Sequence, residues 1–163
     1  MVDYCSFCVM KNRARDFGLL FYGGETGRHN NITDVPGVSV GYSTIIEEGR
    51  IHTGVTAILP RGRDRSTSHC VAATHCLNGN GEMTGTAWVN ELGALSSPIM
   101  ITNTYAVGSV HRALIDWVNE GNSSDKPYEG ILPIVAETWD GFLSDIKGEN
   151  NIMFIVFYIY KYS

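Results

Sequence analysis

The sequence predicts one mixed α/β domain, and three observations lead to that expectation. The chain has 163 residues, about the size of a single domain. Its content of 44% hydrophobic and 18% charged residues is typical of a folded globular protein. Short apolar runs of strand length stand on both sides of one clear amphipathic helix. The 18 glycines indicate many tight turns and few long helices.

The first half of the chain contains three predicted strands. Residues 31–43, NITDVPGVSVGYS, form a turn and then a strand, because Val38 and Val40 alternate with small or polar residues. A second strand, TGVTAILP, spans 53–60 and ends at its proline. The small apolar run HCVAATHCL, residues 69–77, is a candidate for the third.

The second half holds the predicted helix between two further strands. The segment PIMITNT, 98–104, forms the fourth strand, and ILPIVAE, 131–137, the fifth. The helix covers 106–121, with Asn103 or Thr104 placed to cap its N-terminus. Its single apolar stripe consists of Val107, Val110, Leu114, Trp117 and Val118.

Charge and composition argue against several classes of function. The net charge is −5, and Asp64 interrupts the one basic run, RGRDRS, so we expect no nucleic-acid partner. The N-terminus has neither a basic start nor a long apolar run, so we expect no signal peptide, no membrane association and a cytoplasmic location. Cys5 and Cys8 form a lone CxxC, which we interpret as reduced thiols.

Four potential metal ligands occur close together in the sequence, but we expect no metal or other cofactor. On a straight strand, residues six positions apart share a face yet are separated by about 20 Å. One ion therefore cannot bind them all unless the segment bends back, and we expect these side chains to pack in the core or an interface. The four residues are His69, Cys70, His75 and Cys76.

The glycine-rich stretch 77–93, LNGNGEMTGTAWVNELG, predicts a loop that builds part of a site. Its glycines allow tight turns and a close approach of the backbone to a small substrate. Trp88 and Glu91 would project from this loop, where a carboxylate beside an indole face can hold an ammonium group. The alternative is an ordinary glutamate that faces solvent.

The junction of the fourth strand and the helix, ITNTYAVGS at 101–109, is a second candidate site. A helix N-terminus offers unpaired N–H groups and a partial positive charge, which suit an anion such as an acyl-transfer oxyanion. Tyr105 would add a hydroxyl donor and Asn103 an amide. The alternative is a capped helix with an aromatic side chain packed beside it. Further on, Glu137 and Asp140 either orient a turn or shape the same cleft.

Five long motifs together resemble the L-aminopeptidase/D-esterase family, which includes DmpA-type enzymes and β-peptidyl aminopeptidases. The resemblance covers 13–147, whereas 1–12 and 148–163 form a divergent extension and a divergent apolar tail. The motifs are RARDFGLLFYGGETGRHNNITDVPGVSVGYST (13–44), HTGVTAILPRG (52–62), LNGNGEMTGTAWVNELG (77–93), PIMITNTYAVGSV (98–110) and LPIVAETWDGFLSDI (132–146).

The resemblance implies an α/β/β/α sandwich, similar to the N-terminal-nucleophile hydrolases and incomplete in this chain. Family members cleave themselves ahead of a serine, which becomes the N-terminal nucleophile. They release N-terminal residues from small peptides, amides or esters, without a cofactor, and we expect a homo-oligomer in the intact family. By position, Tyr105 matches the tyrosine that stabilises the oxyanion, and Glu91 is a weaker match for binding the substrate amine, with Trp88 and Asn103 as further substrate contacts.

The sequence departs from the family where the catalytic serine would lie. The self-cleavage site and nucleophile follow the DGFLSDI motif in the family, so we expect this chain to be an N-terminal fragment without activity of its own. The apolar run 152–160 suggests a frameshift or read-through, with a buried strand as the alternative. Two other functions stay open: a fragment that docks on a full-length homologue, and an acetyltransferase similar to ornithine acetyltransferase.

Overall fold

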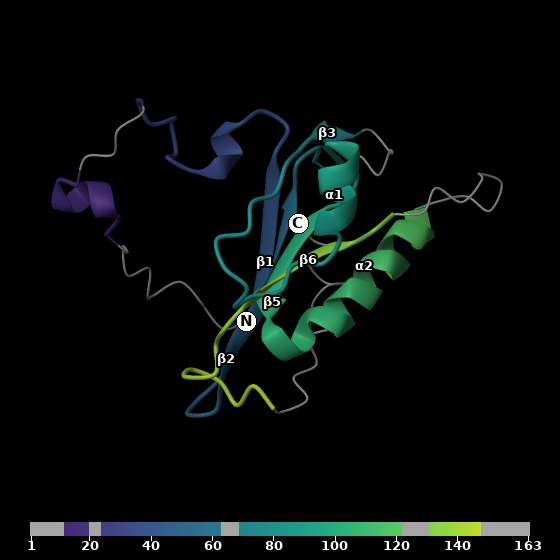
Figure 1. The fold of residues 1–163 in the computed structure, drawn as a ribbon. Helices are drawn as coiled ribbons and strands as arrows, with labels where there is room; N and C mark the ends of the chain where they lie inside the picture. Colours follow the sequence, from purple (N-terminus) through teal and green to yellow (C-terminus); the bar gives the residue numbers. More distant parts are fainter. Residues whose placement is uncertain (1–11, 20–23, 63–68, 122–130, 148–163) are drawn as a thin grey trace. The chain divides into compact units, whose positions relative to one another are not determined.

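The computed structural model describes residues 12–19, 24–62, 69–121 and 131–147, and these residues fall in two compact units (Figure 1). The first unit ends at Asn31 and the second begins at Ile32. Each unit has its own internal contacts. The N-terminal CxxC and the apolar run 152–160 lie outside the described residues.

The first unit is organised by Arg13. A short 3₁₀ helix, η1 (Ala14–Phe17), follows this arginine. The Arg13 backbone N–H donates to Asp16 Oδ2 at 2.7 Å, while its guanidinium donates to the carbonyl oxygens of His29 and Asn30 and to Asn31 Oδ1. One side chain thus joins the start of this unit to its end.

The second unit is built on a four-stranded sheet with the order β1-β2-β5-β6. After the 3₁₀ helix η2 (Ile32–Asp34), strands β1 (Ser39–Glu47) and β2 (Ile51–Leu59) form an antiparallel hairpin. Strand β5 (Ile99–Asn103) pairs antiparallel with β2 and parallel with β6 (Ile134–Thr138). These four strands confirm four of the five predicted ones.

Helix α2 (Val107–Gly121) connects β5 to β6 and covers one face of this sheet (Figure 1). Its predicted apolar stripe is confirmed, because Val110, Ala113 and Leu114 are fully buried and pack on Val55 and Met100 of the sheet. On its outer side, Arg112 binds Asp116 one turn later. The hydrogen bond and the charge of Asp116 raise the pKa of the Arg112 guanidinium.

Part of the opposite face is covered by smaller elements. Strands β3 (Cys70–Val71) and β4 (Ala94–Leu95) form a two-stranded sheet, and helix α1 (Thr86–Leu92) precedes β4. Val89, Leu95 and Ile134 form a second core cluster there. Ile134 and Val135 belong to different clusters because successive strand residues point to opposite faces. Toward β1, by contrast, Tyr42 and Ile46 are exposed.

Two sequence expectations were wrong. The third predicted strand, 69–77, pairs only at Cys70 and Val71; beyond them the backbone makes no ladder. The glycine-rich stretch is not a loop throughout, because α1 occupies Thr86–Leu92. Gly85 and Gly93 bound this helix with φ angles of 71° and 67°, so the glycines start and stop a helix that ordinary helix-forming residues build.

Within the described ranges, none of the helices is both long and apolar enough to cross a membrane.

A glycine in β2 is required by the approach of β1. A Cβ atom at Gly54 would lie 2.3 Å from the carbonyl oxygen of Ser43. We expect Gly54→Ala to lower the free energy of unfolding by about 1–3 kcal/mol, the usual cost of overpacking, in urea denaturation. Gly108→Ala is the matched control, since a Cβ atom there meets no heavy atom within 4 Å and alanine favours a helix. Equal effects of the two substitutions would contradict this assignment.

Candidate functional site

Tyr105 stands on the 3₁₀ turn η3 (Thr104–Ala106), between the end of β5 and the start of α2. Its side chain is 62% exposed, and its hydroxyl makes no hydrogen bond to the described residues. The next two residues, Ala106 and Val107, are buried in the main core. The turn therefore fixes the backbone of Tyr105 while leaving the phenol accessible.

Asn103 caps this turn, as one of the two predicted capping residues. Its Oδ1 accepts a hydrogen bond from the Ala106 N–H at 2.9 Å, and its Nδ2 donates to Thr53 Oγ1 at 2.9 Å. Asn103 is only 3% exposed. The oxygen and the nitrogen of this side-chain amide thus each make a hydrogen bond within the protein. The predicted contact of Asn103 with substrate stays a prediction.

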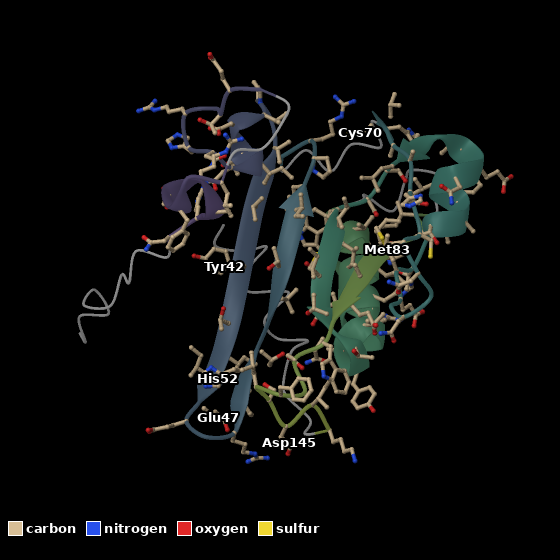
Figure 2. All side chains as sticks on the ribbon, turned by 60° about the vertical axis from the view of Figure 1, so that its left-hand side comes forward. Tyr42, Glu47, His52, Cys70, Met83 and Asp145 are labelled. Carbon is tan, nitrogen blue, oxygen red and sulfur yellow. The ribbon has the colours of Figure 1, made fainter. Side chains whose placement is uncertain are left out.

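The hydrogen bonds continue from Asn103 across the sheet. Thr53, on β2, donates its hydroxyl proton to Asp140 Oδ2. The other carboxylate oxygen, Oδ1, is buried and has no hydrogen-bond partner in the described part of the chain. Asp140 begins the turn after β6. Ser144 attaches this turn to His52 of β2, and Asp145 attaches it to Arg50, the residue just before β2. Figure 2 shows His52 and Asp145 at this end of the sheet.

Trp88 and Glu91 lie on the opposite face, on helix α1. Trp88 is 38% exposed and Glu91 is exposed, while Val89 between them is buried in the second core cluster. Gly85 lets the start of α1 pack closely against β6, because a Cβ atom at this position would lie 2.6 Å from Ile134 Cδ1. The helix therefore presents an indole and a carboxylate to solvent from a closely packed base.

The segment before α1 is attached to the edge of β6. The Thr84 N–H donates to the Val135 carbonyl and the Glu137 N–H to the Glu82 carbonyl, both at 3.0 Å. The Thr84 hydroxyl also donates to the Pro133 carbonyl at 2.7 Å. Since β6 pairs with β5, these bonds connect the base of α1 to the strand that leads to Tyr105.

The site candidates thus fall into two groups. Asn103 and Tyr105 belong to the β5–α2 junction beside the main core, and Trp88 and Glu91 to α1 above the second core cluster. No hydrogen bond joins the two groups within the described ranges. The sequence pattern gave no sign of Thr53, whose hydroxyl is part of the first group, because a threonine in a strand carries no functional signal of its own.

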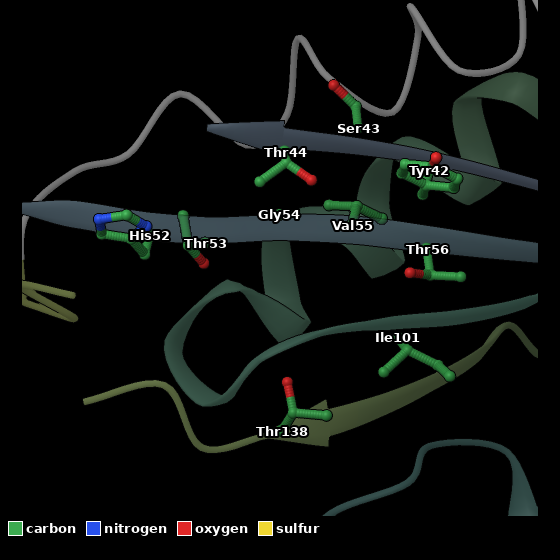
Figure 3. A pocket seen from close by; sticks show the side chains of 10 residues that line it. All are labelled: Tyr42, Ser43, Thr44, His52, Thr53, Gly54, Val55, Thr56, Ile101 and Thr138. Carbon is green, nitrogen blue, oxygen red and sulfur yellow. The ribbon is translucent and has the colours of Figure 1, made fainter. Parts of the chain in front are cut away.

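A pocket of about 360 Å³ lies on the sheet face opposite α2 (Figure 3). Most of its lining comes from β1 and β2, with Ile101 of β5 and Thr138 of β6, and it includes the hydroxyl groups of Thr44, Thr56 and Thr138. His52 and Tyr42 also line it, whereas none of the carboxylates of the described residues does. Among all the residues that the structure describes, no group of three His, Cys, Asp or Glu side chains could hold a metal ion. Arg61 donates to Cys70 Sγ and to the carbonyl oxygen of His69.

Residues 30–155 match the family described as peptidase family S58. The chain belongs to this family. Two β-peptidyl aminopeptidases BapA are similar to it: that of Sphingosinicella microcystinivorans is 44% identical over 146 residues, and that of Sphingosinicella xenopeptidilytica is 40% identical over 144. Each alignment covers 83% of this chain but 35% of the relative, so this S58 chain spans about a third of their length.

Solved S58-like structures have the same fold over the shared part. A Burkholderia sp. β-aminopeptidase matches with a TM-score of 0.82 at 44% identity, covering 91% of this chain and 42% of that protein. The L-aminopeptidase D-Ala-esterase/amidase of Ochrobactrum anthropi matches with 0.81 at 42% identity, covering 93% and 44%. That enzyme is described as a prototype for the serine aminopeptidases and a variant of the Ntn hydrolase fold. The S58 chain therefore has the predicted α/β fold, which matches part of the longer architecture of these relatives.

Proposed function

We propose that this chain supplies the N-terminal part of a serine aminopeptidase that releases N-terminal residues from peptides, amides or esters. Membership of family S58 and the similarity to β-aminopeptidases support this class of reaction. In this proposal the attacking serine comes from family residues that follow the matched region, after self-cleavage. The 163 residues alone would then bind substrate poorly and turn none over.

The observation that carries the proposal is the position of Tyr105. It is exposed, its hydroxyl is free of hydrogen bonds to the described residues, and it stands where a helix begins. A donor fixed before the reaction stabilises a developing oxyanion without reorganisation. Asn103 has both ends of its amide in internal hydrogen bonds, which support a role in holding the turn, and its contact with substrate stays a prediction.

Trp88 and Glu91 complete the proposal as the group that binds the free amine of the substrate. The Glu91 carboxylate gives the ammonium an opposite charge, and the Trp88 ring offers a face for it. Both project from the exposed side of α1, whose buried side is fixed by Val89. In this proposal the amine is bound by these two side chains while the neighbouring scissile carbonyl is directed toward Tyr105.

Loss of the Tyr105 hydroxyl tests the proposal. We suggest a chimeric precursor in which residues 13–147 replace the equivalent part of the Burkholderia sp. β-aminopeptidase. We expect Tyr105→Phe to lower kcat on an aminoacyl p-nitroanilide about 10²-fold with little change in KM, since one oxyanion donor is lost. Tyr42→Phe, which alters another exposed tyrosine, is the control.

The activity of the isolated chain tests whether a serine from outside it is needed. We expect no turnover of the same nitroanilide by the purified 163-residue protein. Turnover that persists through purification and disappears in Tyr105→Phe would contradict the proposed need for a serine from outside the chain. An unchanged kcat of Tyr105→Phe in the chimera would contradict the role of the tyrosine.

The amine-binding group makes a separate prediction. We expect Glu91→Gln in the chimera to raise KM for substrates with a free amine about tenfold, a loss of about 1.4 kcal/mol, and to leave kcat nearly unchanged. Glu120→Gln, at an exposed glutamate of α2, is the matched control. Steady-state kinetics measure both. If KM is the same in the two variants, Glu91 does not bind the amine.

The uncovered part of the sheet favours a second candidate, a fragment that docks on a full-length homologue. Tyr42 and Ile46 expose apolar surface on β1 beside the threonines of the pocket, and exposed apolar side chains on an uncovered sheet face tend to bind another surface. We expect this chain to co-purify with a full-length S58 homologue, and Ile46→Lys to weaken the association about tenfold or more. Elution of the two proteins as separate species at micromolar concentrations would exclude this candidate.

A further inference from the structure

We propose that Thr53 and Asp140 are positioning residues for Tyr105. They hold the amide of Asn103 in the orientation that caps the turn, and so they set the direction in which the phenol points. This inference rests on the proposed oxyanion role of Tyr105. It adds two residues from other elements, β2 and the turn after β6, to the junction that carries the tyrosine.

The direction of every hydrogen bond in the series is determined by its two ends. The Ala106 backbone N–H can only donate, and an ionised carboxylate at Asp140 can only accept. Asn103 must therefore turn Oδ1 toward Ala106 and Nδ2 toward Thr53, whose hydroxyl accepts that bond and donates its own proton onward. A flipped amide would place two donors against each other at Ala106.

Burial keeps water from replacing these bonds. Thr53 is 6% exposed and Asn103 is 3% exposed. A buried polar group that loses its partner keeps its full desolvation cost, so removal of one member disturbs the next. The state of the Asp140 carboxylate is in this way transmitted through two side chains to the backbone N–H that follows Tyr105.

Asp140 is held against Thr53 by a second connection. The Asp140 carbonyl accepts from the Ser144 N–H at 2.9 Å, and the Ser144 hydroxyl accepts from the His52 N–H at 2.6 Å. His52 directly precedes Thr53 in β2. The turn after β6 is therefore attached to the same strand through the Ser144 side chain, which keeps the Asp140 carboxylate beside the Thr53 hydroxyl.

Tyr105 depends on this support because its own side chain is mostly exposed. Packing covers less than half of its surface, so the backbone of η3 sets the point from which the side chain leaves the fold. That backbone is fixed at both ends by one side chain, since Asn103 precedes the turn and Ala106 closes it. A small rotation of this turn would move the phenol away from a reacting carbonyl, and misplacement of about 1 Å costs an enzyme about 10²-fold in rate.

The buried oxygen Oδ1 of Asp140 indicates that stability alone does not explain this carboxylate. It has no hydrogen-bond partner among the described residues, and burying an unpaired carboxylate oxygen is unfavourable. A neutral side chain at this position would avoid that cost. A carboxylate oxygen is, however, a strong acceptor for the Thr53 hydroxyl at the end of the series.

A double-mutant cycle in the chimeric precursor tests the inference. We expect Thr53→Val, which keeps the shape but removes the hydroxyl, to lower kcat about tenfold with KM nearly unchanged. In the Tyr105→Phe background the same change should have almost no further effect, because its influence passes through the phenol. Thr53→Ser, which restores a hydroxyl, should restore most of kcat. If the double variant lost kcat by the product of the two single losses, the inference would be overturned. A merely structural defect would lower kcat by the same factor whether or not the Tyr105 hydroxyl is present.

Amide hydrogen exchange of the full 163-residue chain gives a readout without activity. We expect Thr53→Val and Asp140→Ala each to speed exchange at Ala106 tenfold or more relative to Val110 and Leu114, which lie in the core of α2. Equal acceleration at all three amides, or none at Ala106, would overturn the inference. If Thr53→Val does not fold, Asp140→Ala tests the same hydrogen bonds with a change in the turn after β6, outside the sheet.

Failure of this inference is distinguishable from failure of the proposed function. If Tyr105→Phe alone leaves kcat unchanged, the oxyanion role is wrong and the positioning role falls with it. If Tyr105→Phe lowers kcat but Thr53→Val acts independently of it, only the positioning role is wrong.

Discussion

Packing of helix α2 against the middle of the sheet is the interaction on which the second unit depends. Strand β5 is central, with β2 on one side and β6 on the other, and Met100 at its middle is fully buried under the helix. Each large apolar side chain buried in this way stabilises the fold by about 1.5–3 kcal/mol. Because β5 runs directly into α2, the same packing that forms the core also fixes the junction between them.

That junction must satisfy polar groups at the boundary of the core. The first N–H groups of a helix lack partners within it, and those at the start of η3 and α2 are close to buried residues. Asn103 supplies the cap, and Thr53 and Asp140 supply partners for its amide. A polar network is therefore present because the fold places a helix start here, and the exposed Tyr105 lies within the turn that it fixes.

The two faces of the sheet differ in how far they are covered. The α2 side is closed, whereas the other side is covered only where α1, β3 and β4 pack on Ile99 and Ile134. In the two solved relatives this chain matches 42% and 44% of the protein, so more than half of their structure has no counterpart among these residues. The exposed Tyr42 and Ile46 lie on the strand farthest from the covered region. A site assembled here from two groups on different core clusters would become complete only with further structure.

The sequence by itself determined the strands β1, β2, β5 and β6 and the helix α2, and it narrowed the cap to Asn103 or Thr104, because alternation, helical periodicity and capping are local properties that neighbouring residues specify. It failed where local signals conflict: the glycines of 77–93 indicated a loop, yet Gly85 and Gly93 bound a helix. Only the tertiary structure decided that Thr53 meets Asn103, 50 residues away, and Asp140, 87 residues away. Hydrogen bonds between distant segments leave no periodic pattern in the chain, since strand order and helix packing alone bring their partners together.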